Sequence, residues 1–186
     1  MSENTVLALV GSLRAGSTNR QLAEATAQVS PEGTTVVIFD GLAEIPFYNE
    51  DLDVEGQVPA AALRLREAAA GAAGILFFTP EYNGTMTAVL KNAIDWLSRP
   101  FGAGALKDKA VAVLGTAYGQ YGGVWAHDDA RKSLKIAGAT VLEDVKVAIP
   151  GSVVRFAELH PKDDAEVVGQ VTEALETLLG SGKVAA

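Results

Sequence analysis

A cluster of hydroxyl, amide and guanidinium groups follows the first apolar run of the chain, Val6–Val10. The next segment reads GSLRAGSTN (residues 11–19) and leads into a helical pattern. Glycines let a backbone approach an anion closely, and the N–H groups at a helix start attract negative charge. Arginine can bind a phosphate through two nitrogens, and hydroxyl and amide groups can donate further hydrogen bonds. The segment therefore predicts a pocket for a phosphorylated small molecule, with the expected ligands Gly11, Ser12, Arg14, Ser17 and Asn19.

The composition restricts the possible functions. The chain has 186 residues, 48% hydrophobic and 20% charged, which favours a single domain over residues 1–186 with a core from about 5 to 179. The formal net charge of −8 argues against nucleic acids and anionic membranes as partners, because both require clustered Lys and Arg. The absence of cysteine excludes thiolate nucleophiles, iron–sulfur clusters and cysteine-bound zinc, and we expect no metal site. Any redox chemistry must therefore come from a bound cofactor.

No targeting or membrane segment is expected. Residues 1–5 are polar and lack the charged-then-apolar layout of a signal peptide. The longest nearly apolar run, residues 68–78, is interrupted by Gly71 and Gly74 and is too short to span a bilayer. These features favour a cytoplasmic location.

Strand and helix patterns alternate along the chain. Four runs, at 6–10, 35–39, 74–79 and 110–115, are apolar on both faces and predict strands of a covered parallel sheet. A more polar run at 140–149 predicts an edge strand. The predicted helices are one capped by Ser17 or Thr18, those at 58–73, 85–98 and 123–137, and one starting at a capping box of Asp163 and Glu166. This order predicts a doubly wound α/β fold whose ligand lies at the carboxyl ends of the strands, and the long connection at 41–56 is a further functional candidate.

Three kinds of phosphate site compete for the first loop. A nucleotide triphosphatase would need a lysine where Ser17 stands, and no acidic residue for magnesium follows the third strand. A dinucleotide fold would need a glycine where Leu13 stands; Asp40 could imitate its ribose-binding acid, but a carboxylate after a strand is commonly a turn residue. A mononucleotide with one terminal phosphate, such as FMN, matches the loop best. A polar turn before a capped helix, without a ligand, is the alternative.

The second loop narrows the choice. It reads FFTPEYNGT (77–85) and is followed by LKNAIDW (90–96). With the first loop, these segments resemble the NADPH-dependent FMN reductase family, whose signatures are G-S-x-R-x-x-S-x-N and P-E-Y-N followed by L-K-N-A-I-D-W. The third loop, GTAYGQYGG (115–123), and the segment IPFYNED (45–51) are also similar, so that the resemblance covers about residues 5–149. The TMT segment (85–87) departs from the family, in which a serine and a proline are frequent, and we expect this difference to alter the entrance to the flavin pocket.

The resemblance implies a flavodoxin-like fold, a five-stranded parallel sheet of order 2-1-3-4-5 with helices on both faces. It implies FMN as cofactor, NADPH or NADH as co-substrate, and a small-molecule electron acceptor: FMN, a quinone, an azo dye or a metal oxyanion. Hydride transfer on the flavin N5 requires no catalytic side chain, and alternate binding of the two substrates predicts ping-pong kinetics. Whether the flavin is retained or released stays open. The expected flavin contacts beyond the first loop are Pro80, Glu81, Tyr82, Asn83, Gly84, Thr116, Tyr118 and Gly119.

Some features of the sequence are not explained by the family resemblance. A flavodoxin-like electron carrier without NAD(P)H activity is the alternative function, although the usual T/S-x-T-G-x-T loop of such carriers is absent. We expect a core or solvated role for His127, and a solvated ion-pair face formed by Lys91, Asp95 and Arg99. Large apolar groups near Trp96, Pro100 and Phe101 favour an interface. The resemblance implies a homodimer or homotetramer formed through the 85–98 helix, with the segment 46–49 reaching the partner's flavin.

Overall fold

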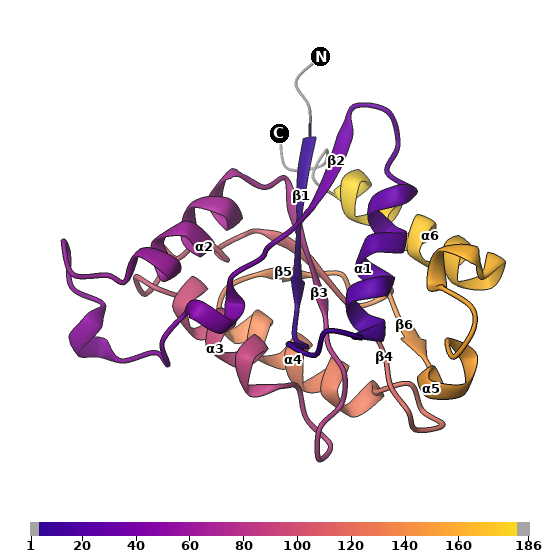
Figure 1. Ribbon diagram of the computed structural model, residues 1–186. Coiled ribbons are helices and arrows are strands. Elements are labelled where there is room, and N and C mark those ends of the chain that lie inside the picture. Colours follow the sequence, from indigo (N-terminus) through magenta and orange to yellow (C-terminus); the bar gives the residue numbers. More distant parts are fainter. Residues whose placement is uncertain (1–3, 182–186) are drawn as a thin grey trace.

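A parallel sheet forms the centre of the computed structural model, which describes residues 4–181 (Figure 1). Its strand order is β2-β1-β3-β4-β5, with β6 also paired to β4, and the doubly wound fold predicted from the sequence is confirmed. The central strands are buried on both faces, as their uninterrupted apolar runs predicted. The strands are β1 (Asn4–Val10), β2 (Thr34–Ile38), β3 (Gly74–Phe78), β4 (Ala110–Thr116), β5 (Thr140–Val141) and β6 (Val147–Ile149).

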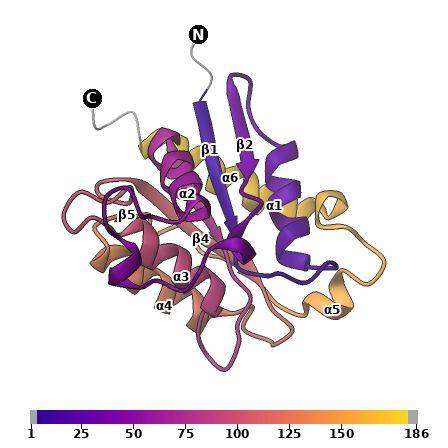
Figure 2. The same ribbon diagram turned by 60° about the vertical axis from the view of Figure 1, so that its left-hand side comes forward.

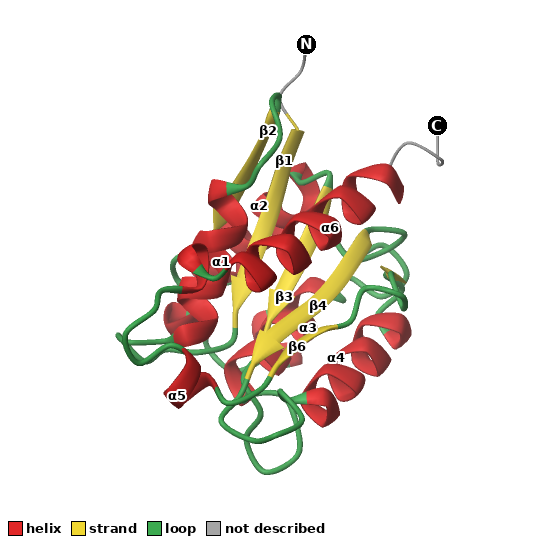
Figure 3. Cartoon of the chain, turned by 90° about the vertical axis from the view of Figure 1, so that its right-hand side faces the viewer, coloured by secondary structure: helices red, strands yellow, loops and turns green. Residues whose placement is uncertain are grey.

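Helices cover both faces of the sheet (Figures 1 and 3). Alternate side chains of the strands point to opposite faces, so Leu9 and Phe77 pack under one helical layer while Ala8 and Leu76 pack under the other. The first layer contains α2 (Ala60–Gly71), α3 (Ala88–Leu97) and α4 (Val124–Ile136). The second contains α1 (Thr18–Gln28) and α6 (Ala165–Ser181). Among residues 4–181, no helix combines the length and the apolar character needed to cross a membrane.

Several predicted boundaries were wrong. The run 140–149 is not one strand: β5 pairs with Ala110 and Val111, β6 pairs with the end of β4, and the chain leaves the sheet between them (Figure 1). The exposed polar pair Glu143 and Asp144 lies in this break. The cap of α6 is Asp164, whose carboxylate accepts from Val167 N–H at 3.3 Å, because Asp163 belongs to a short 3₁₀ turn.

Other elements were missed or displaced. The third predicted helix begins at Ala88 instead of residue 85, because the chain first makes a tight turn. A short helix, α5 (Ser152–Arg155), follows β6, and the connection 41–56 contains two 3₁₀ turns, Leu42–Glu44 and Glu50–Leu52. The tail predicted from Gly180 onward still belongs to α6 up to Ser181, and its remainder lies outside the described residues.

Candidate functional site

The loops that follow β1, β3 and β4 meet at one edge of the sheet, the lower edge in Figure 1. Parallel strands bring their carboxyl ends to the same edge, which is where doubly wound folds bind ligands. The three loops carry the flavin-site residues predicted from the sequence, except Asn19 in the first turn of α1 and Thr116 at the end of β4. Each loop is fixed by contacts with a neighbouring element, and these contacts define the geometry of the site.

The first loop presents hydrogen-bond donors that have no partner within the described residues. Ser17 caps α1: its buried hydroxyl accepts from Arg20 N–H at 3.1 Å. The N–H groups of residues 12–16 donate to no acceptor within the described part of the chain. The exposed guanidinium of Arg14 has no hydrogen bond or ion pair to these residues either. Free N–H groups, a helix start and an unpaired cation together suit a phosphate dianion.

Gly11 fixes the start of this loop. Its N–H donates to Phe78 O at 2.7 Å, which continues the pairing of β1 with β3. A Cβ at this position would lie 2.7 Å from Thr87 Oγ1 and 3.1 Å from Leu90 Cβ. Close packing against the start of α3 therefore disfavours any side chain at this position.

Asn19 and Thr116, both predicted as ligand contacts, are bound to each other. Asn19 Nδ2 donates to Thr116 O at 2.8 Å, and Thr116 N–H donates to Asn19 Oδ1 at 3.0 Å. Both residues are buried, and the Thr116 hydroxyl donates to Ile149 O at 2.9 Å. The two hydrogen bonds between Asn19 and Thr116 hold the first turn of α1 against the end of β4.

The second loop ends in a tight hairpin turn. Tyr82 and Thr85 exchange two backbone hydrogen bonds of 3.0 and 3.2 Å across Asn83 and Gly84. The φ angles of Asn83 (53°) and Gly84 (76°) are both positive, as a type I′ turn requires and as an Asn-Gly pair favours. The turn leaves Tyr82 55% exposed beside the first loop, and both line a cleft.

Glu81 makes a contact that the sequence did not predict. Its Oε2 accepts from the backbone N–H groups of Trp125 (3.2 Å) and Ala126 (3.3 Å), in the first turn of α4. The N-cap position of α4 is Gly123, which has no side chain to cap the helix. Glu81 thus joins the second loop to the end of the third.

The third loop is open at its tip and crowded at its ends. Tyr118 is 77% exposed, and a Cβ on Gly119 would meet no atom within 4 Å. At the start of the loop, a Cβ on Gly115 would lie 2.2 Å from Thr79 O, and at its end one on Gly122 would lie 2.5 Å from the Ala148 backbone. The exposed tip and the packed ends leave the sides of Tyr118 and Gly119 free to contact a ligand.

His127 is a core residue, as expected. It lies in α4 and is 1% exposed. Burial lowers the pKa of His127 to about 4, and the positive charge of Arg131 acts in the same direction. The imidazole is therefore neutral at neutral pH and cannot supply a positive charge to the site.

The connection 41–56 forms a wall of the site and is held by α3 (Figure 2). The buried Asn92 amide accepts from Tyr48 N–H at 2.8 Å and donates to Pro46 O at 3.0 Å and to Ile45 O at 3.3 Å. The indole of Trp96 also donates to Pro46 O, at 2.8 Å. A cleft of about 540 Å³ lies between this wall and the first two loops. Its apolar lining and few polar groups are typical of a small-molecule site. It is lined by Gly11, Leu13, Arg14, Leu42, Ala43, Ile45, Pro46, Phe47, Tyr82, Thr87, Ala88, Val89 and Asn92.

A charged cluster fixes the far end of this wall. Asp53 lies 2.7 Å from Arg66 and 3.5 Å from Arg99, and accepts from the Tyr48 hydroxyl at 3.3 Å. Burial alone would raise the pKa of Asp53, but the hydrogen bond and charge of Arg66, with help from the Tyr48 hydroxyl and Arg99, hold it below its usual value. Arg99 is thus not part of the solvated face that was predicted; Lys91 and Asp95 do form that pair, at 2.6 Å.

Trp96, Asn92 and Glu81 stand in the motifs that suggested the family, but their contacts were missed. Trp96 is fully buried within the chain, whereas Phe101, which the sequence also suggested for an interface, is 88% exposed. The Trp96 ring packs edge-on against the Tyr48 ring, with 5.0 Å between the ring centroids. The Arg66 guanidinium carbon lies 5.2 Å from the centroid of the Trp96 ring. For Asn92 and Trp96, the sequence signal was the presence of a polar and an aromatic residue on a largely apolar helix.

The fold and the three loops define a flavodoxin-like nucleotide-binding protein. The model of one family, NADPH-dependent FMN reductase, matches residues 4–153, and the chain belongs to that family. An NAD(P)H-dependent FMN reductase of Pseudomonas aeruginosa is 37% identical over 174 residues, covering 92% of each chain. A quinone reductase of Pseudomonas putida is 36% identical over 160 residues, covering 86% of this chain and 85% of the relative.

Comparison with solved structures also finds a flavoenzyme. The flavoenzyme NAD(P)H:(acceptor) oxidoreductase FerB of Paracoccus denitrificans superposes with a TM-score of 0.82 at 26% identity, covering 97% of each chain. The protein is thus an NAD(P)H-dependent FMN oxidoreductase, with FMN as cofactor and NAD(P)H as co-substrate. The electron-carrier alternative is set aside, because the family is enzymatic.

Proposed function

We propose that the first loop binds the phosphate of FMN and that the flavin ring lies along residues 80–84, with Tyr118 and Gly119 completing the pocket. The observation that carries this proposal is the free donor set of the first loop: the N–H groups of residues 12–16, the start of α1 and the unpaired Arg14. A terminal phosphate needs this combination of donors and cation. The residues present therefore fit the cofactor.

The predicted residues divide into two roles in this proposal. Ser12 and Arg14 face solvent at least in part and bind the phosphate directly. Ser17 and Asn19 are buried and act by holding the loop in place. Ser17 caps α1, and Asn19 bonds α1 to the end of β4. When bound, the flavin supplies the redox chemistry, because it can accept a hydride from NAD(P)H and pass two electrons to an acceptor.

The proposed acceptor is a quinone. The support is the name of the Pseudomonas putida relative and the largely apolar cleft between Phe47 and Tyr82, which suits a flat ring. NAD(P)H and acceptor would use this open region in turn, so steady-state kinetics should give parallel double-reciprocal lines. We also propose a cytoplasmic location, where NAD(P)H is available.

The test compares FMN with riboflavin, which lacks the phosphate. Arg14→Ala should weaken FMN binding about 10- to 100-fold, because a charge-assisted hydrogen bond contributes about 1.5–3 kcal/mol. Riboflavin binding should not change. The control is Lys132→Ala, which removes one positive charge from an exposed position of α4. Equal affinities of the wild type for FMN and riboflavin would contradict the phosphate site.

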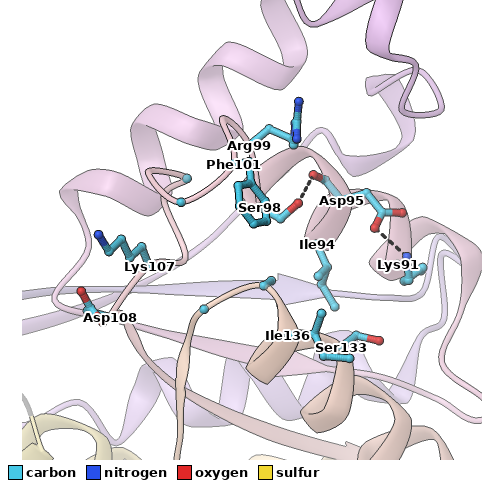
Figure 4. A pocket seen from close by; sticks show the side chains of 14 residues that line it. Lys91, Ile94, Asp95, Ser98, Arg99, Phe101, Lys107, Asp108, Ser133 and Ile136 are labelled. Atoms are coloured by element: carbon cyan, nitrogen blue, oxygen red, sulfur yellow. Dashed lines mark hydrogen bonds and ion pairs between the residues drawn. The ribbon is translucent and has the colours of Figure 1, made fainter.

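We further propose that the protein is a homodimer or homotetramer in which a second copy covers the groove between α3 and α4. This groove has a volume of about 560 Å³, and Figure 4 shows Ile94 and Ile136 directed toward each other within it. Phe101 at its rim is 88% exposed and Ile136 is 78% exposed, which is unusual for large apolar side chains. The family resemblance also implies subunit contacts through α3, the helix predicted at 85–98.

Light scattering tests the assembly. The wild type should give the mass of a dimer or tetramer, and Phe101→Asp should shift it to the monomer, because a charge in an apolar contact is costly. Val154→Asp, at an exposed position of α5, is the control. A monomeric mass for the wild type would contradict the proposed assembly.

A further inference from the structure

Helix α4 begins without a cap of its own. Gly123 at its N-cap has a φ angle of 91°, and the preceding Gly122 has a φ of 65°. A Cβ on Gly122 would also lie 2.5 Å from the Ala148 backbone, so a side chain is excluded there. The first N–H groups of any helix lack intrahelical partners. Ser, Thr, Asp or Asn normally supplies the missing acceptor, but the positive φ of Gly123 strains any side chain at the N-cap position.

Glu81 supplies the missing acceptor from another loop. One oxygen, Oε2, accepts from both Trp125 and Ala126, 44 and 45 residues further along the chain. The negative charge also lies at the positive end of the α4 dipole, where it is favourable. Cβ of Glu81 lies 3.6 Å from the position of a Cβ on Gly123, so the two segments are packed together as well as hydrogen-bonded.

This contact controls where the third loop ends. At its start, the loop is anchored by Ala117, whose N–H donates to Ile149 O at 3.1 Å and whose carbonyl accepts from Ser152 N–H at 3.1 Å. At its end, it runs into the first turn of α4, the turn that Glu81 caps. Between these anchors lie Tyr118 and Gly119, with few contacts of their own.

We propose that Glu81 is a positioning residue: it sets the spacing between the second and third loops by capping α4, and does not act through a direct contact of its charge with the flavin. This inference rests on the proposed flavin site and changes the role that the family resemblance implied for Glu81. Because Tyr82 follows Glu81 directly, the cap ties the hairpin turn to the opposite wall of the pocket. The two walls between which the ring is proposed to lie are thereby held as one unit.

The test compares three substitutions. Glu81→Gln keeps a carbonyl oxygen that can accept both hydrogen bonds but removes the charge, whereas Glu81→Ala removes the acceptor. Glu67→Ala removes the same charge from an exposed position of α2 and is the matched control. For a positioning role, Glu81→Ala should raise the dissociation constant of FMN about tenfold, the size expected for a lost cap, while Glu81→Gln and Glu67→Ala stay within about threefold of the wild type.

Two further readouts separate positioning from direct contact. In the protein without flavin, amide hydrogen exchange at Trp125 and Ala126 should be faster in Glu81→Ala than in the wild type, and close to wild-type rates in Glu81→Gln. The reduction potential of bound FMN should be the same in Glu81→Gln and in the wild type. A potential that changes on loss of the charge alone, or exchange rates unaffected in Glu81→Ala, would overturn the inference. Failure of the wild type to bind FMN would instead overturn the proposed function.

Discussion

Replacement of Asn92 by alanine tests how the wall of the cleft is held. The change removes three hydrogen bonds, of 2.8, 3.0 and 3.3 Å, to the segment 45–48. Pro46 O keeps the bond from the Trp96 indole, so the groups left without a partner are Tyr48 N–H and Ile45 O. With about 1–2 kcal/mol for each unpaired group, the free energy of unfolding should fall by about 2–4 kcal/mol.

The aspartate variant sharpens this test. In Asn92→Asp, one oxygen can still accept from Tyr48 N–H, but the other replaces a donor and faces the carbonyl oxygens of Ile45 and Pro46. A buried carboxylate beside two carbonyls is unfavourable, so Asn92→Asp should be no more stable than Asn92→Ala. Urea denaturation followed by circular dichroism measures both. A loss below about 0.5 kcal/mol in Asn92→Ala, or wild-type stability of Asn92→Asp, would refute this account of the wall.

Two further predictions concern packing and pH. Gly11→Ala should lower the free energy of unfolding by about 1–3 kcal/mol, because the new methyl group would lie 2.7 Å from Thr87 Oγ1. In Gly16→Ala the methyl group would meet nothing closer than 3.6 Å, so this control should change the stability little. Thermal melts compare the two variants. His127 has a folded pKa of about 4, below its unfolded value of 6.5, so its contribution to stability is fully present above pH 6.5 and is lost as the pH falls toward 4. The loss should reach about 3 kcal/mol, and a stability profile of His127→Gln that keeps the wild-type slope in this range would contradict it.

The sheet and its order were accessible from the sequence because burial on both faces leaves an uninterrupted apolar run. Val6–Val10 and Gly74–Phe78 are such runs, and each is followed by a glycine, proline or polar residue at the sheet edge. The break between β5 and β6 was not accessible, since the alternation at Val145 and Val147 fits one strand as well as two. Likewise, Met86 has helical spacing, but the turn at Asn83 delays α3 to Ala88.

The sequence indicated which residues to expect in the candidate site, but it did not predict several of the contacts that these residues make. Glycine, serine and arginine in the first loop point to an anion because their chemistry is local. The bonds of Asn19 with Thr116 and of Glu81 with α4 join residues far apart in the sequence, and no spacing rule contains them. Asn92 likewise reads as an ordinary polar position of a helix until the segment 45–48 is seen to cross it.

Anaerobic mixing of the FMN-loaded protein with NADPH tests the central claim most directly. The visible absorbance of bound flavin should bleach at a rate that saturates with NADPH, and a quinone added afterwards should restore it. The comparison with NADH then gives the co-substrate preference. A protein that captures no FMN, or whose bound flavin keeps its colour with both NADPH and NADH, would contradict the account.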